Sequence, residues 1–317
     1  MFIENLRFSL NASVPIVLMM ILGYICRRIN LLDDHTTAKI NKFTFSAALP
    51  SLLFMDLSTA DFRAVWDGRL VGFCIVVTFL SVGIAVVYSL FHKDKAERGE
   101  IIQASYRSSA AILGIAFVKN IYGEALMAAL MIVGTVPIYN IIAVAVLAAT
   151  SPEKKGESKK ELFLDTVRGV VTNPIIIGIG LGMIWSLLKI PQPVIMEKTI
   201  SYMGNMATPL SLIALGASFK TSEAKSKVGV TVGICFIKLI LFCGIFLPVA
   251  VNMGFRGEKL VAILVMLGSA TTGSCFVMVK NFGHKGTITA FSVMLTTICS
   301  AFTLTLWLFL LRTLGYI

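Results

Sequence analysis

The stretch LGSATTGSCFVMVKNFG, residues 267–283, has an apolar flank on each side of a centre made only of small and polar residues, 269–274. The stretch ASYRSSAAILGIAFVKNIYG, residues 104–123, has the same character, with a polar, small centre at 107–110. Gly114, Phe117 and Val118 of this stretch recur as Gly273, Phe276 and Val277, at a fixed offset of 159 residues. Two related segments so far apart in one chain predict an internal repeat.

Further matches keep this offset across distant parts of the chain. The alternative is a helical bundle whose halves match by coincidence, but two prolines and two glycines at one offset favour a true repeat. The matches are Pro15 with Pro174; Leu22, Gly23 and Ile25 with Leu181, Gly182 and Ile184; Ala48, Pro50 and Leu53 with Ala207, Pro209 and Leu212; and, one residue out of register, RGE 98–100 with RGE 256–258.

The composition predicts a membrane protein. Of the 317 residues, 56% are hydrophobic and 14% are charged, whereas soluble domains have about 45–50% apolar and about 25% charged residues. The apolar residues fall into blocks long enough to cross roughly 30 Å of hydrocarbon as helices. We therefore expect an all-α polytopic membrane protein with ten transmembrane helices, near residues 9–26, 36–56, 69–91, 101–118, 124–149, 163–188, 196–218, 227–251, 258–280 and 286–314.

Other classes of protein are disfavoured. The net charge of +11 comes from basic residues in short loops, where they orient a membrane protein rather than bind nucleic acid. The six cysteines form no C-x-x-C pair and the three histidines lie near loops, without an H-E-x-x-H motif. The loops also lack paired carboxylates and a Ser/His/Asp set, so we expect no metal, no cofactor and no enzymatic activity.

The repeat predicts the organisation of the chain. Residues 1–149 form a first five-helix repeat, 150–162 a cytoplasmic linker, and 163–317 a second five-helix repeat. Because five is odd, the second repeat enters the membrane from the opposite side, as in many secondary transporters. With both termini outside the cytoplasm, 17 lysines and arginines fall on the inner side and 9 on the outer, which favours this orientation in the cell membrane.

The two polar centres predict broken helices. Irregular backbone at membrane depth persists only where it lines a cavity or packs against protein. We expect the fourth and ninth spans to unwind there and cross, with helix N-termini that favour an anion. The alternative is that small residues only let helices pack closely. The candidate substrate-binding residues are Ser108, Ser109, Ala110, Ser269, Thr271, Thr272, Gly273 and Ser274.

Two cations and one polar pair complete the candidate site. Arg107 and Lys238 lie deep in apolar segments, where a charge is costly and usually functional. Both are candidates to attract a carboxylate; the alternatives are snorkelling for Arg107 and a structural tie to a carbonyl for Lys238. Tyr139 and Asn140 follow Pro137 in the fifth span and could bind substrate, or only bond between helices.

The chain resembles the auxin efflux carrier family, the PIN-like transporters and their bacterial relatives. The resemblance covers nearly the whole chain and departs at three points: Ile175, Ile176 and Ile177 replace the end of the plant NPNTY motif, and both crossovers lack the plant prolines. The residues that carry it are Val14-Pro15, MILGY (20–24), INKF (40–43), ALPSLLF (48–54), GIAFVKNIYG (114–123), IYN (138–140), Asn173-Pro174, ATPLSLIALGASF (207–219) and FVMVKNF (276–282).

This resemblance implies an elevator-type carrier of a compact microbial type. Its scaffold would be spans 1, 2, 6 and 7, about 9–56 and 163–218, and its transport unit spans 3–5 and 8–10, about 69–149 and 227–314. The substrate class would be a small organic anion, such as malate, malonate or an auxin-like acid, and the scaffold could form a homodimer. Residues expected to act in the scaffold or gate are Pro50, Leu53, Asn173, Pro174 and Pro209.

Three alternatives remain open. A sodium-coupled symporter of the bile-acid transporter type shares the inverted five-helix repeat, and Ser269, Thr271 and Thr272 could supply oxygens to a cation. A channel would show a filter repeated around a pore, and a membrane sensor is a further possibility. Dependence of transport on sodium separates the first alternative from an organic-anion carrier.

Overall fold

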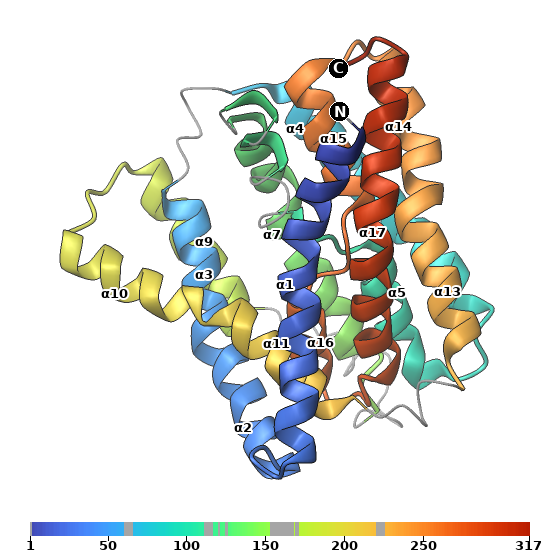
Figure 1. Ribbon diagram of the computed structural model, residues 1–317. Coiled ribbons are helices and arrows are strands. Elements are labelled where there is room, and N and C mark those ends of the chain that lie inside the picture. Colours follow the sequence, from blue (N-terminus) through green and yellow to red (C-terminus); the bar gives the residue numbers. More distant parts are fainter. Residues whose placement is uncertain are drawn as a thin grey trace.

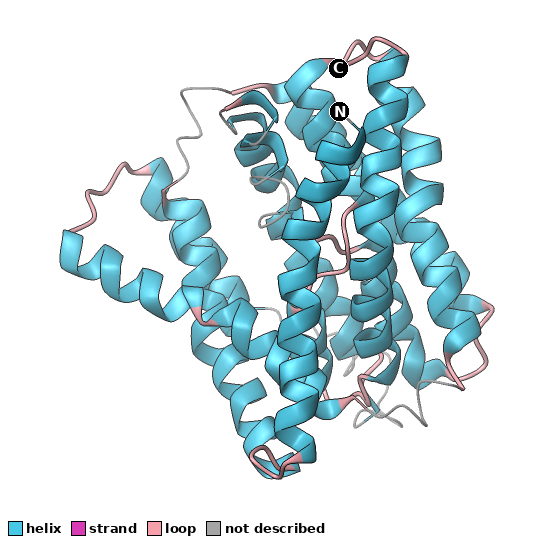
Figure 2. Ribbon diagram, viewed as in Figure 1, coloured by secondary structure: helices cyan, strands magenta, loops and turns pink. Residues whose placement is uncertain are grey.

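The computed structural model of the chain describes residues 2–59, 66–110, 117–119, 121–123, 126–152, 168, 171–219 and 226–317. All regular secondary structure in these ranges is helical, and they contain no β-strand (Figure 2). The helices of the first half are α1 (Phe2–Arg28), α2 (Asp34–Phe43), the π-helical turn η1 (Thr44–Ala48), α3 (Leu49–Ser58), α4 (Gly68–Leu90), the short 3-10 helix η2 (Lys95–Glu97), α5 (Arg98–Tyr106) and α7 (Leu126–Ala149).

The second half has the same kinds of element. Its helices are α9 (Pro174–Leu187), α10 (Val194–Asn205), α11 (Ala207–Ser218), α13 (Val228–Phe236), the π-helical turn η4 (Ile237–Leu241), α14 (Phe242–Asn252), α15 (Gly257–Gly268), α16 (Ser274–Asn281) and α17 (Thr287–Thr313).

Side-chain caps fix where several of these helices begin. The carboxylate of Asp33 accepts a hydrogen bond from Thr36 N at 2.6 Å, and that of Asp67 accepts from Arg69 N and Leu70 N. Asn173 caps α9 by accepting from Ile175 N at 2.9 Å, and Pro174 at the first helical position lacks the N–H that a cap would otherwise satisfy. These caps satisfy backbone donors that a helix start leaves unpaired.

The helices are those of a polytopic membrane protein. Among the described residues, four helical segments are long and apolar enough to cross a membrane: Gly68–Leu90, Leu130–Ala149, Val228–Asn252 and Thr287–Thr313. Helix α4 exposes a face of large apolar side chains, which in water would be a large unfavourable patch and in a bilayer meets lipid. The members of this face are Val76, Phe79, Leu80, Val87 and Leu90.

The four membrane-crossing segments coincide with the expected third, fifth, eighth and tenth spans. The second span is α2, η1 and α3 in succession, and the seventh is interrupted at Met206, between α10 and α11. The fourth and ninth spans are broken, as the polar centres predict. The sixth span is described at residue 168 and from residue 171 onward, and most of the expected linker lies outside the described residues.

Two groups of helices lie side by side (Figure 1). In one group α3 packs along α9 and α10, and α1 packs along α11. In the other, α4 packs on α5 and α7, while α13 packs on α17. Helix α1 also runs along α17 and so joins the groups. The N- and C-termini lie at the same end of the molecule (Figure 1).

Glycines bring the helices of the first group into close contact. A Cβ on Gly182 of α9 would stand 2.8 Å from Phe54 O of α3, and a Cβ on Gly23 of α1 would press on Ile213 O of α11. Adding the 159-residue offset to Gly23 and Phe54 gives Gly182 and Ile213. The offset that relates the two sequences therefore also relates these two helix contacts.

Candidate substrate-binding site

Two broken helices meet in the middle of the molecule. Helix α5 ends at Tyr106, and Arg107 is extended with φ −82° and ψ 120°. Helix α15 ends at Gly268, Ser269 is extended with φ −78° and ψ 160°, and α16 begins only at Ser274. The interrupted segments pair with each other through an isolated antiparallel bridge between Ser108 and Thr271, in which Ser109 N donates to Ala270 O at 2.9 Å.

Thr271 holds this crossing in place. Its backbone N–H donates to Thr296 Oγ1 of α17 at 3.0 Å, and its own hydroxyl donates to Ala104 O, near the end of α5, at 2.8 Å. Thr271 and Ser108 are both buried. Because buried backbone groups without partners are costly, these bonds explain how extended backbone persists at this depth.

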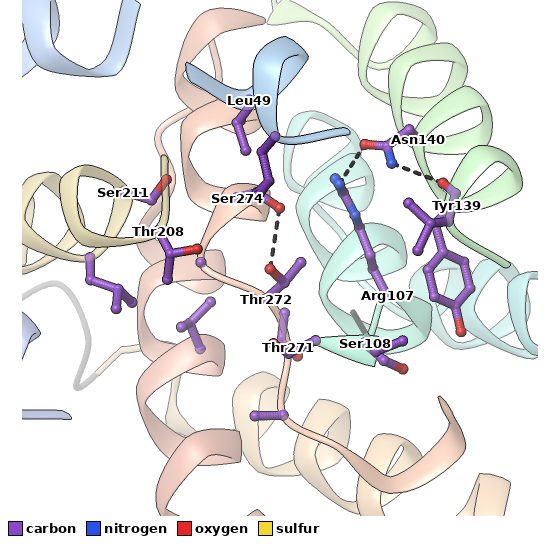
Figure 3. A pocket seen from close by; sticks show the side chains of 18 of the residues that line it. Leu49, Arg107, Ser108, Tyr139, Asn140, Thr208, Ser211, Thr271, Thr272 and Ser274 are labelled. Carbon is purple, nitrogen blue, oxygen red and sulfur yellow. Dashed lines mark hydrogen bonds between the residues drawn. The ribbon is translucent and has the colours of Figure 1, made fainter. Parts of the chain in front are cut away.

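A cavity lies beside the crossing (Figure 3). It offers about 80 Å³ of water-accessible volume, enough for several waters or a small organic molecule. Eleven of the candidate site and gate residues predicted from the sequence line it: Leu53, Arg107, Ser108, Ser109, Ala110, Tyr139, Asn140, Thr271, Thr272, Gly273 and Ser274.

Arg107 supplies the positive charge of the cavity. Its side chain is buried, and one guanidinium nitrogen donates to Asn140 Oδ1 at 2.6 Å (Figure 3). Another guanidinium nitrogen contacts Met278 Sδ. Asn140 Nδ2 in turn donates to Val136 O at 2.8 Å, within α7. None of the ion pairs found among the described residues involves Arg107. An anion in the cavity would therefore meet a guanidinium that has no carboxylate partner in that part of the chain.

Tyr139 and the start of α16 shape the rest of the cavity. The Tyr139 ring packs on that of Tyr106 with centroids 5.7 Å apart, and Tyr106 OH donates to Tyr139 O at 2.9 Å. At the other side, Thr272 and Ser274 place their hydroxyl oxygens 3.3 Å apart (Figure 3). Gly273 and Ser274, at the start of α16, line the cavity, and a helix N-terminus favours negative charge.

Several residues singled out from the sequence do not line the cavity. Lys238 is fully buried behind the crossing, where its ammonium donates to Tyr106 O at 3.0 Å and to Ser108 Oγ at 2.5 Å. Ser269 is also fully buried, and its hydroxyl has no hydrogen-bond partner among the described residues. The structure puts four others among the packed helices instead: Pro50, Asn173, Pro174 and Pro209.

The cavity also has walls that the polar centres did not reveal. Leu49, Leu52 and Asp56 of α3 and Thr208 and Ser211 of α11 line it. Leu49 and Thr208 differ by 159 residues, and so do Leu52 and Ser211. The repeat offset was therefore a signal that could have found these positions, although neither pair shares a residue type.

Membrane-crossing helices with a cavity at a paired helix break are the arrangement of a membrane transporter. The chain belongs to the Membrane transport protein family, which matches residues 8–308 and includes the PIN-like auxin efflux carriers. It is 22% identical over 268 residues to "Uncharacterized transporter YfdV" of Escherichia coli (strain K12), covering 83% of this chain and 85% of that one.

Two further relatives extend over more of the chain. An "Uncharacterized transporter" of Methanothermobacter thermautotrophicus is 20% identical over 303 residues, covering 94% of this chain and 97% of the relative. The "Putative malonate transporter" of Rhizobium meliloti is 22% identical over 312 residues and covers 94% of both chains. The bacterial and archaeal relatives are thus transporters in name, and one name specifies a dicarboxylate.

Proposed function

We propose that this protein is a secondary carrier that moves a small organic anion across the cell membrane. The observation that carries the proposal is the cavity at the crossing, where Arg107 and the N-terminal end of α16 offer positive charge to one small ligand. A guanidinium can bind a carboxylate through two parallel hydrogen bonds. The substrate class is a carboxylate such as malonate or malate, with an auxin-like acid as a larger candidate, and the relative named for malonate supports the dicarboxylate.

The mechanism we propose is an elevator-type alternation of access. The cavity lies between α3 and α11 on one side and the crossing on the other. Residues of about 9–56 and 163–218 would form the scaffold, and about 69–149 and 227–314 the transport unit that carries the site. Sliding of the transport unit along α3 and α11 would expose the same site first to one side of the membrane and then to the other.

The proposed frame is a ten-helix inverted repeat with a first half 1–149, a linker 150–162 and a second half 163–317. The paired contacts of Gly23 and Gly182 and the cavity positions on α3 and α11 at the 159-residue offset support it. Termini at one end of the molecule agree with an even number of crossings (Figure 1), and both ends are proposed to lie outside the cytoplasm. A homodimer through the scaffold belongs to the same proposal.

The first test is binding of small carboxylates to the purified protein. Malonate, malate, larger aromatic acids and amino acids are screened for a rise in melting temperature, in sodium and in choline salts. A ligand of the folded state stabilises by mass action, about 2.7 kcal/mol at a hundred times its Kd. We expect a carboxylate to stabilise the protein in both salts; stabilisation by sodium alone would favour the bile-acid symporter reading.

A matched pair of variants then locates the site. Arg107→Gln removes the charge in the cavity, whereas Arg7→Gln makes the same change at an exposed position of α1. We expect the carboxylate Kd to rise about tenfold or more in Arg107→Gln, because a hydrogen bond to a charged group contributes about 1.5–3 kcal/mol. Arg7→Gln should bind as the wild type does. Equal affinity in both variants would remove Arg107 from the site, and uptake into proteoliposomes tests whether binding leads to transport.

A further inference from the structure

Lys238 is a basic residue buried inside the molecule. It lies in the π-helical turn η4 and is fully buried. None of the ion pairs found within the described ranges includes it. Its contacts are the carbonyl oxygen of Tyr106, the hydroxyl of Ser108 and, at 6.0 Å from its centroid, the ring of Phe242. Because an uncompensated charge at this depth is costly, its neutral partners need an explanation.

Both broken helices are linked to this ammonium, α5 directly and α15 through the Ser108 hydroxyl. Tyr106 is the last residue of α5, and its carbonyl accepts directly from Lys238. The Ser108 hydroxyl, which also accepts from Lys238, donates to Met266 O in the last turn of α15. Helix C-termini carry unpaired carbonyls and a partial negative charge. The two negative helix ends are therefore the counter-charge of Lys238.

The turn that carries Lys238 is itself specialised. Residues Ile237–Leu241 form a π-helical turn inside an otherwise α-helical span, and Trp307 Nε1 of α17 donates to Leu239 O at 3.0 Å. Such π-turns are rare and occur often at functional sites. The position 159 residues earlier is Phe79, on the lipid-facing side of α4, so only one half of the chain supplies this cation.

In carriers with broken helices, half-helix C-termini and unwound carbonyls often coordinate the coupling cation. We propose that the ammonium of Lys238 is a covalently tethered replacement for such a cation, so that the crossing needs no bound sodium. The oxygens of Tyr106, Ser108 and Met266 would then form a monovalent-cation site once the lysine side chain is removed. The transport consequence rests on the proposed carrier function, whereas the cation site can be measured without any substrate.

The experiment compares the melting temperature of the full-length protein in sodium, potassium, methylammonium and choline chloride at equal concentration. The wild type should show no cation preference. Lys238→Ala, which removes the ammonium and its stem, should gain a saturable rise of about 3 °C or more in sodium or methylammonium relative to choline. Lys238→Met is the matched control, because its side chain fills the same space without charge and should show no such rise.

Two results would overturn the proposal: a saturable, sodium-specific stabilisation of the wild type, or a folded Lys238→Ala protein that is indifferent to every cation. Should the variants not fold, the wild type alone decides, since indifference to sodium supports a tethered cation and preference for sodium contradicts it. The screen for carboxylates has a separate readout. Suppose that Lys238→Ala binds a cation but the wild type binds no carboxylate. This inference would then stand, and the proposed substrate class would be wrong.

Discussion

The two half-helices that lead into the crossing begin alike and end differently. Each starts at a copy of the sequence RGE, yet α5 runs for 9 residues and α15 for 12, a difference of nearly one helical turn. The earlier end of α5 places Arg107 in the cavity and leaves the Tyr106 carbonyl to Lys238. The later end of α15 is followed by hydroxyls and glycine. The two half-helices thus begin alike, whereas the guanidinium that lines the cavity, that of Arg107, comes from the end of α5.

The glutamates of the two RGE copies make similar contacts. Glu100 accepts hydrogen bonds from Gly286 N at 2.8 Å and from Thr289 N at 3.1 Å, and so caps the start of α17. Glu258 accepts from Met127 N at 2.9 Å, at the start of α7. Both glutamates therefore cap a long helix far away in the sequence, although Glu100 is buried and Glu258 is half-buried.

The largest expected effect tests this difference in burial. Glu100→Gln replaces a carboxylate with an amide whose NH₂ group faces backbone donors, so we expect it to destabilise the protein by about 2–4 kcal/mol. Glu258→Gln makes the same change where water can reach the side chain, and we expect a loss of about 1 kcal/mol or less. Thermal unfolding in detergent measures both.

Glu197→Gln is the control for these variants, because Glu197 lies exposed in the first turn of α10. Its effect should stay within about 0.5 kcal/mol of zero. Equal losses in Glu100→Gln and Glu258→Gln would show that burial does not distinguish the two caps, and the two halves would then be energetically alike at this point.

The sequence predicted the crossing well for a physical reason. Polar and small residues in the middle of an apolar span are tolerated only for packing or for a cavity, and two such centres at one offset marked the same feature twice. The α3 and α11 walls were missed because their residues, such as Leu49 and Thr208, are ordinary in a membrane helix. Which face of a helix they occupy depends on packing that one sequence does not display.

Lys238 shows a further limit of the sequence. The sequence showed that Lys238 lies deep in an apolar span, and a hydrogen bond to a carbonyl was one of the two interpretations. The sequence did not show which carbonyl accepts this bond. The carbonyl of Tyr106 becomes available only because α5 ends there. The partner is thus a consequence of backbone conformation, which no residue type encodes directly.

The next expected effect concerns the close helix contacts of Gly23 and Gly182. Alanine at Gly182 would place its Cβ 2.8 Å from Phe54 O, and alanine at Gly23 would crowd Ile213 O. Both contacts are with backbone, so a helix must shift, and we expect each variant to lower the free energy of unfolding by about 1–3 kcal/mol.

Gly180→Ala is the matched control in α9, since nothing lies within 4 Å of its added Cβ. It should be neutral or stabilise the protein by up to about 1 kcal/mol. A large loss at one glycine and none at the other would break the equivalence of the two contacts.

One ion pair lies at each end of the helices that surround the crossing. At the end with the termini, Asp67 at the start of α4 pairs with Lys259 of α15 at 2.5 Å. At the opposite end, Lys227 at the start of α13 pairs with Glu97 of η2 at 2.7 Å. In the first pair the residue at the helix start, Asp67, is the acid, whereas in the second pair the residue at the helix start, Lys227, is the base.

The smallest expected effect is the pH dependence of the Asp67 pair. The hydrogen bond from Lys259 and those from Leu70 N and Arg69 N lower the pKa of Asp67 below its ordinary value of 3.8. A carboxylate with a lowered pKa in the folded state stabilises the fold fully above that ordinary value, and this stabilisation is lost as the pH falls through the lower, folded-state pKa. The pair is partly exposed, so its contribution should be under about 1 kcal/mol.

A double-mutant cycle of Asp67→Asn, which keeps the helix cap, and Lys259→Met isolates the coupling by thermal unfolding at pH 7 and at decreasing pH. The coupling should be present at pH 7, disappear in acid and weaken in high salt; a coupling that survives protonation of Asp67 would mean that the two side chains are held together by packing rather than by charge.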